Sequence, residues 1–203
     1  MPPAVILLLV SSQTGFNHHL RYVLPAFPFA FIAISRVCRA ADLGHRRTCL
    51  LASLAFAWSL QSSLFVYPHS LSYFNEAVGG PAGGHYHLGN SNVDWGQDLL
   101  YLKRWLQDHP EAHPLSLAYD MPLIDPTIVG IQWSVTPRAP QPGWHAASIN
   151  LIHDRHQRYE YFLDFRPVGR AGHSIWIYHL TPEDVARWQT VSALSPLPSQ
   201  ALP

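Results

Sequence analysis

Charged residues are scarce in this sequence of 203 residues. Only 13% are Asp, Glu, Lys or Arg, against about 25% in a typical soluble domain. The shortage is strongest at the start, since Met1 to Val66 contains five arginines, one aspartate and no other charged side chain. The formal net charge is zero with neutral histidine. No basic run interleaves with aromatic residues, which argues against nucleic acid as the main partner.

Cysteine is also scarce. Cys38 and Cys49 lie in or beside apolar segments without CxxC spacing, so neither a disulfide framework nor a zinc site is expected. The thirteen histidines are scattered and form no HExxH motif. His85 and His87 alternate on an extended segment, but two ligands at this spacing are only weak support for a divalent metal. The sequence therefore indicates no cofactor, and a divalent metal stays an unsupported option.

Two long apolar runs, Tyr22–Val37 and Thr48–Val66, lie in the region that is poor in charge. A spanning helix needs about 20 mostly apolar residues, and the second run meets this length. The first run meets it only if the helix begins near Leu20 and the Arg36 side chain extends to the membrane surface. We therefore expect two full spans, although two buried core helices of a soluble protein could show a similar pattern.

The link between the runs, Arg36–Arg47, holds four arginines and one aspartate. Short loops rich in Lys and Arg stay in the cytoplasm, so Gln13–Arg21 and the chain from Tyr67 onward are expected outside. Tyr22 and Tyr67 fall where an interfacial aromatic belt would place them. The short apolar stretch Pro2–Gln13 is similar to the last part of a third span whose beginning is missing.

Residues 67–190 are expected to form a small α/β extracytoplasmic domain, after membrane helices in residues 1–66 and before a disordered tail in residues 191–203. Alternating helix and strand patterns favour this fold class. Strands are expected at Leu115–Tyr119, Ile128–Val135, Ala146–Ile152 and Ser174–Leu180. Loops are expected at Gly79–Gly84 and Pro137–Gly143. Helices are expected from an Asp94–Gln97 capping box to Pro110, over Asp154–Phe165, and from Thr181 to about Gln189.

The block Phe74–Leu106 resembles the C-terminal region of bacterial phospholipid carrier-dependent glycosyltransferases. These are membrane enzymes of the GT-C type, related to protein O-mannosyltransferases and aminoarabinose transferases. The most specific part is Ser91–Leu99, with the sequence SNVDWGQDL. This chain has Asn90 where the family often has an acidic residue. Weaker matches lie at His19–Pro28, Pro142–Ile152 and Pro167–Leu180.

The resemblance implies a larger bundle of spanning helices and a catalytic carboxylate in the first extracytoplasmic loop of the family. No position of this chain matches that loop, so no catalytic residue is assigned and Met1 is expected to begin a fragment. The implied partners are membrane lipid, a polyprenyl-phosphate sugar and an acceptor glycan or protein. The implied location is the bacterial inner membrane. The alternative hypothesis is a stand-alone membrane-anchored module that binds glycans or proteins.

The candidate residues for binding the lipid phosphate or the acceptor are His19, Arg21, Tyr22, Asn75, Glu76, Asp94, Trp95, Gln97 and Asp98. Arg21 could bind a phosphate bidentately or extend to ordinary lipid headgroups. Asp94 and Asp98 could act in acid–base or metal chemistry, but capping and charge at a helix start are favoured. Trp95 and Tyr73 could stack on sugar rings, but a role as core residues or interfacial anchors is favoured.

Overall fold

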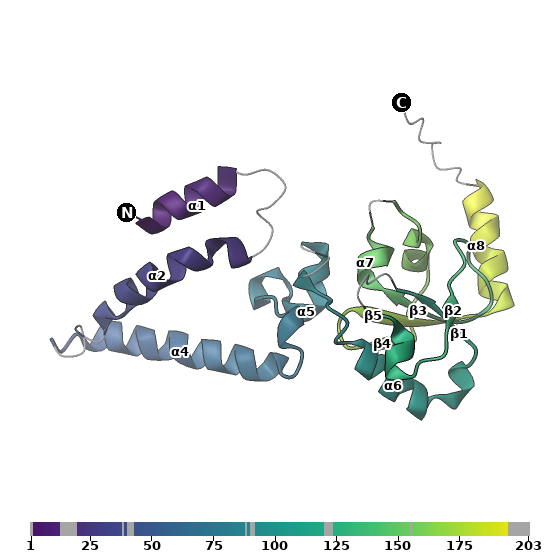
Figure 1. Cartoon of the computed structure of the whole chain (residues 1–203), viewed down its shortest axis with the longest axis horizontal. Helices are drawn as coiled ribbons and strands as arrows, with labels where there is room; N and C mark the ends of the chain where they lie inside the picture. Colours follow the sequence, from purple (N-terminus) through teal and green to yellow (C-terminus); the bar gives the residue numbers. More distant parts are fainter. Residues whose placement is uncertain are drawn as a thin grey trace. The chain divides into compact units, whose positions relative to one another are not determined.

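The chain divides into two compact units, Met1–Ser70 and Leu71–Pro203, which are called here the helical unit and the α/β unit (Figure 1). The computed structural model describes residues 2–12, 20–37, 39, 43–87, 89, 92–119, 124–154 and 156–194.

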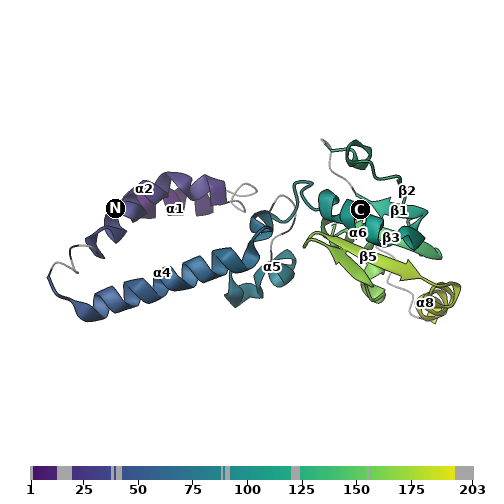
Figure 2. The same cartoon turned by 90° about the horizontal axis from the view of Figure 1, so that it is seen from below.

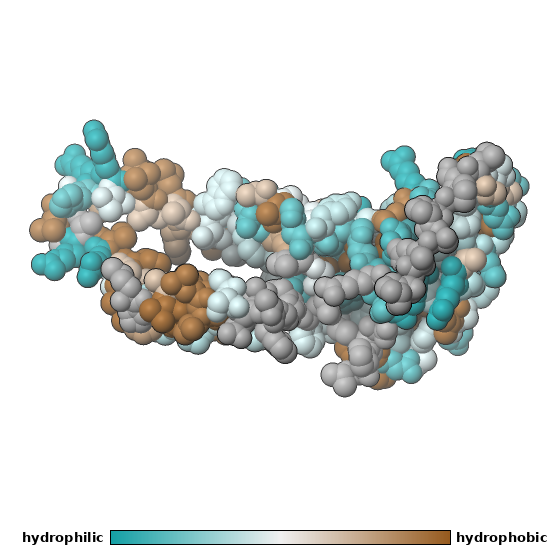
Figure 3. All heavy atoms as spheres, turned by 90° about the horizontal axis from the view of Figure 1, so that it is seen from above, coloured by the Kyte–Doolittle hydropathy of each residue, from teal (hydrophilic) through white to brown (hydrophobic). Residues whose placement is uncertain are grey.

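The helical unit consists of apolar helices whose side chains are largely exposed. Its described elements are α1 (Pro2–Ser12), the 3-10 segment η1 (Leu20–Ala26), α2 (Phe27–Ile34) and α4 (Arg46–Val66). Among the described helices, only α4 is long and apolar enough to cross a membrane. In α4 only Ser62 and Val66 are buried, whereas a core helix of a soluble protein buries a full apolar stripe. Figure 3 shows hydrophobic residues gathered over this unit.

The expected span Tyr22–Val37 does not form one long helix, so the second full span is not confirmed. The chain follows a 3-10 path through Ala26, and α2 is only eight residues long. Pro25 lies inside the 3-10 segment and Pro28 lies in the first turn of α2. Proline has no N–H to donate to the helix ladder, which accounts for the break before Phe27.

The α/β unit is built on a five-stranded mixed sheet with the order β2-β1-β3-β5-β4. The pairs β2–β1 and β1–β3 are parallel, whereas β3–β5 and β5–β4 are antiparallel. Figure 2 labels β2, β1, β3 and β5 in this order. The strands are β1 (Leu115–Ala118), β2 (Ser134–Val135), β3 (Gly143–Ser148), β4 (Gly169–Ala171) and β5 (Ile175–Leu180). This sheet confirms the expected α/β domain.

Each face of the sheet packs against its own helices. On one face, Leu99, Leu102 and Leu106 of α6 (Leu99–Asp108) pack against Leu117 and Ile177. The spacing of these three leucines places them on one side of a helix. The opposite face is covered by residues of three other elements. They are α7 (Ile149–Ile152), the 3-10 segment η8 (Glu160–Asp164) and α8 (Pro182–Leu194).

Several predicted elements match the structure. The expected strand Leu115–Tyr119 corresponds to β1, and the expected strand Ser174–Leu180 corresponds to β5. The expected loop Pro137–Gly143 lies between β2 and β3, and its last residue is the first residue of β3. The helix predicted from Thr181 is α8. It begins with reciprocal capping, because Thr181 Oγ1 accepts from the Asp184 N–H at 3.2 Å and Asp184 Oδ2 accepts from the Thr181 N–H at 3.1 Å.

Other expectations are wrong in position or type. The predicted strand Ala146–Ile152 ends at Ser148, whose hydroxyl caps the short helix α7 by accepting from the Asn150 N–H at 3.4 Å. The predicted helix Asp154–Phe165 is mostly irregular and holds only η8. Gln157 has φ +52°, which interrupts a right-handed helix.

Three further boundaries also differ. The expected strand Ile128–Val135 begins as the 3-10 segment η7 (Pro126–Val129), and only β2 at its end joins the sheet. The expected loop Gly79–Gly84 contains the short helix α5 (Gly80–Gly83). Helix α8 continues to Leu194, beyond the expected end, and the rest of the predicted tail lies outside the described residues.

Candidate functional site

The turn before α6 contains most of the candidate residues in the α/β unit. Asp94 is 2% exposed, and its Oδ1 accepts a hydrogen bond from the Gly96 N–H at 2.8 Å. Gly96 has φ +89°, and a Cβ there would overlap the Ile124 side chain. Glycine is therefore required at this position by both backbone conformation and space.

Gln97 holds the same turn from its other side. Its Oε1 accepts from the Trp95 N–H at 2.7 Å, and its Nε2 donates to the Val93 carbonyl at 2.9 Å. Ser72 Oγ also donates to that carbonyl, at 2.8 Å. The expected capping box is therefore wrong, because Asp94 closes a turn with the residue two positions on and Gln97 bonds Trp95 rather than Asp94. Helix α6 starts later, at Leu99.

Asp98 joins two distant parts of the unit. It is fully buried, and its Oδ2 accepts from the backbone N–H groups of His173 and Ser174, both at 2.8 Å. Gly172 has φ +60°, and a Cβ there would overlap the Asp98 carboxylate. Asp98 precedes α6, so the expected position at the helix start is correct. Its carboxylate, however, makes no cap bond there and instead fixes the β4–β5 turn.

The buried surroundings of Asp94 change its acidity. Burial raises the pKa of Asp94 above its usual range, and the nearby Asp98 charge raises it further. The Gly96 N–H and the hydroxyls of Ser174 and Tyr119 oppose this rise. Burial, followed by the Asp94 charge, also raises the pKa of Tyr119, whose hydroxyl lies 3.5 Å from Asp94 Oδ1. Both carboxylates are buried and accept backbone hydrogen bonds, which favours the structural roles expected for the two aspartates.

The remaining candidates in the α/β unit are exposed. Asn75 caps the 3-10 segment η3 (Glu76–Val78), with its Oδ1 accepting from the Ala77 N–H at 3.1 Å. Trp95 and Tyr73 are 50% and 45% exposed, so of the two favoured roles, core residue or interfacial anchor, the core role is wrong. The roles as interfacial anchors and as rings that stack on sugars stay predictions. Glu76 lies in the first turn of η3 and is exposed.

The candidates of the helical unit are only partly described. His19 lies outside the described residues, and for Arg21 the structure describes the backbone, which follows the 3-10 path of η1. Tyr22 is half-buried in the same segment. The structure therefore brings Asp94, Trp95, Gln97 and Asp98 together in one turn and leaves the lipid-phosphate prediction for His19 and Arg21 untested.

A second group of side chains was not found from the sequence as a group. His85, His153, Arg170 and Trp176 come from four separate elements of the α/β unit and converge with Tyr86. Only His85 was singled out from the sequence, because it alternates with His87. Within the described part of the chain, no three His, Cys, Asp or Glu residues are grouped so as to hold a metal ion.

Comparison of the chain with protein-family models, curated proteins and solved structures finds no match. The glycosyltransferase resemblance is therefore carried by the sequence motifs alone, chiefly Ser91–Leu99.

Proposed function

We propose that this chain is the C-terminal part of a membrane glycosyltransferase that takes sugar from a polyprenyl-phosphate donor. In this proposal the helical unit lies in the inner membrane and the α/β unit lies on the extracytoplasmic side. The chain itself supplies no catalytic carboxylate. Its part in the reaction is to bind the donor lipid beside its helices and to shape the site that receives the acceptor.

The observation that carries the proposal is the Ser91–Leu99 motif, together with the use that the fold makes of it. Asp94 and Gln97 make hydrogen bonds within the turn, and Asp98 ties the turn to the backbone between β4 and β5. Trp95, between them, is left 50% exposed. The polar residues of the motif therefore bond within the fold, and one aromatic ring is exposed. This arrangement suits a surface that contacts sugar, since an aromatic face packs against the apolar face of a sugar ring.

The exposed helix α4 supports a membrane location for the helical unit. It has 21 residues, no charged residue after Arg47, and apolar side chains exposed along its length, including Leu54, Phe56 and Trp58. Transfer of these side chains to lipid is favourable at about 25 cal/mol per Å² of apolar surface. The arginines Arg36, Arg39, Arg46 and Arg47 support a cytoplasmic position for the link between α2 and α4.

Photo-crosslinking tests donor binding without requiring turnover. The full chain in native membranes would be irradiated with a polyprenyl phosphate that carries a diazirine in its first isoprene units. We expect labelling of peptides from the helical unit, and we expect unlabelled polyprenyl phosphate to compete better than phosphatidylglycerol. Substitution Arg21→Gln should reduce labelling about tenfold, whereas Arg104→Gln on α6 serves as the matched control and should not.

Equal competition by both lipids would overturn the proposal. So would equal labelling of the Arg21→Gln and Arg104→Gln variants.

The alternative, a stand-alone membrane-anchored glycan-binding module, is favoured by the exposed rings of Tyr73 and Trp95. It predicts glycan binding that Trp95→Ala removes, in a chain that the donor lipid does not label.

A further inference from the structure

One side of the α/β unit gathers basic and aromatic side chains from four elements, defined here as the His85 cluster. Its members are His85 and Tyr86 of the 3-10 segment η4 (Gly84–Tyr86), His153 at the end of α7, Arg170 of β4 and Trp176 of β5. Neither the sequence motif nor the proposed function uses any of them.

The backbone fixes the two ends of the cluster. Gly84 packs so closely on the Phe74 ring that a Cβ would overlap it, which sets the position of the neighbouring His85. Arg170 and Trp176 are directly paired between β4 and β5. Their side chains therefore lie on the same face of the sheet, and the Arg170 guanidinium carbon lies 4.8 Å from the centre of the Trp176 ring.

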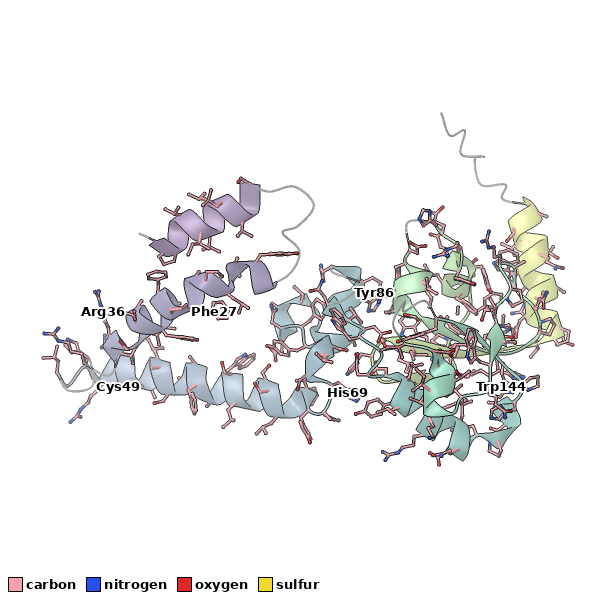
Figure 4. All side chains as sticks on the ribbon, viewed as in Figure 1. Phe27, Arg36, Cys49, His69, Tyr86 and Trp144 are labelled. Carbon is pink, nitrogen blue, oxygen red and sulfur yellow. The ribbon has the colours of Figure 1, made fainter. Side chains whose placement is uncertain are left out.

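The rings of the cluster surround His85. Its ring centre lies 4.0 Å from that of Tyr86, 5.4 Å from that of His153 and 5.6 Å from that of Trp176. Figure 4 shows Tyr86 beside α7, the element that His153 follows. Tyr86 is 70% exposed, and the side chains of His153 and Arg170 are exposed as well. Solutes can therefore reach the cluster, although His85 itself is half-buried.

The His85 cluster contains the positively charged Arg170 and two histidines, and none of its members is acidic. Burial, followed by the proximity of His153 and then Arg170, lowers the pKa of His85 to about 4, while the Ala82 backbone acts in the opposite direction. Burial also lowers the pKa of His153, which Glu160 partly offsets. The Nε2 atom of His85 is buried and has no hydrogen-bond partner in the part of the chain that the structure describes.

We propose that the His85 cluster binds a phosphate group, with Arg170 and the two imidazoles as donors and the Tyr86 ring at the entrance. Arg170 offers a planar fork of N–H groups that matches phosphate oxygens. The lowered pKa values keep both imidazoles neutral at neutral pH, so Arg170 carries the positive charge, and a bound anion would favour protonation of the imidazoles that donate to it. A metal ion does not suit this group, because the guanidinium is always charged and is not a metal ligand.

Histidine titration in the full chain, held in uncharged detergent micelles, tests the site. With ¹³C-labelled histidine, the pKa of each imidazole is measured by NMR in the absence and presence of millimolar inorganic phosphate. The pKa of His85 should rise by about 1 pH unit or more, because a bound anion favours the charged imidazole. The pKa of His153 should rise with it. His109 and His179, which stack on Trp105 and Trp144 instead, serve as internal controls.

Two matched variants sharpen the result. Arg170→Met keeps an unbranched side chain over Trp176 and removes the charge, so it should weaken phosphate binding about tenfold or more. Arg104→Met on α6 removes the same charge elsewhere and should leave binding unchanged. The proposal is overturned if the His85 pKa in the wild-type chain moves neither with inorganic phosphate nor in phosphatidylglycerol nanodiscs, or if both variants weaken binding equally. The wild-type titration decides the question even if a variant fails to fold.

Two sources could supply the phosphate, and two arms of the experiment separate them. A shift of His85 with inorganic phosphate in micelles indicates a soluble phosphate. A shift only in phosphatidylglycerol nanodiscs, compared with micelles, indicates a lipid headgroup. Either result supports the site, and no shift in both overturns it. The proposal is independent of the glycosyltransferase assignment, because polyprenyl crosslinking of the helical unit can fail while the histidine titration succeeds.

Discussion

Substitution Asp98→Ala should strongly destabilise the α/β unit. The carboxylate is fully buried and accepts from two backbone N–H groups, those of His173 and Ser174, at 2.8 Å each. Alanine would leave both donors without this partner in a region closed to water. Each unsatisfied buried donor costs about 1–3 kcal/mol. The free energy of unfolding should therefore fall by about 2–5 kcal/mol, a large part of the stability of a small domain.

The assay is urea unfolding of the full chain in micelles, followed by tryptophan fluorescence, with hydrogen exchange read at the His173 and Ser174 amides. Both amides should lose protection in the variant. Asp108→Ala, at the exposed end of the same helix, is the control and should change stability by no more than about 0.5 kcal/mol. If Asp98→Ala behaves like this control and both amides keep their protection, the clamp between α6 and the β4–β5 turn is refuted.

Three further predictions follow from the same unit. Gly172→Ala should destabilise it by at least about 1 kcal/mol in urea unfolding, because φ +60° is unfavourable for alanine and the added Cβ overlaps Asp98; an unchanged midpoint would contradict the overlap. Thr181→Ala should cost about 1 kcal/mol at neutral pH. Hydrogen bonds from Thr181 lower the pKa of Asp184. Their contribution to folding stability is therefore present above the usual pKa of 3.8 and is lost as pH falls through the lowered pKa. Thermal melts over a series of pH values should show this loss. Burial lowers the pKa of His145 from 6.5, so stability should fall as pH drops below 6.5, and His145→Gln should flatten that slope in unfolding measured at pH 7 and pH 5.

The sequence patterns predicted those elements whose signals are local. The apolar periodicity of α6 and the alternation of β5 depend on spacing within one segment, and the start of α8 depends on four adjacent residues. Other elements of the α/β unit depend on partners that are distant in sequence. Residues 154–165 have a helical composition, but packing of Phe162 into the sheet and the positive φ of Gln157 impose an irregular path.

The sequence motif located the turn before α6 but not the hydrogen bonds that the turn makes. The Ser91–Leu99 motif marked the turn, and structural roles for Asp94 and Asp98 were favoured over chemistry. The partner of Asp98 is the backbone of residues 173 and 174, which no local pattern indicates. The His85 cluster was missed for the same reason, because its members meet only when β4, β5 and η4 are assembled.

We propose that α4 spans a membrane and carries the α/β unit on its extracytoplasmic side. Cysteine labelling in intact cells tests it most directly, in a chain with Cys38→Ala and Cys49→Ala. One reporter is Thr190→Cys on exposed α8 and the other is Leu43→Cys in the arginine-rich link. A maleimide that cannot cross the inner membrane should label the first in intact cells and the second only after permeabilisation. The reverse pattern, or recovery of the chain in the soluble fraction, would contradict the account.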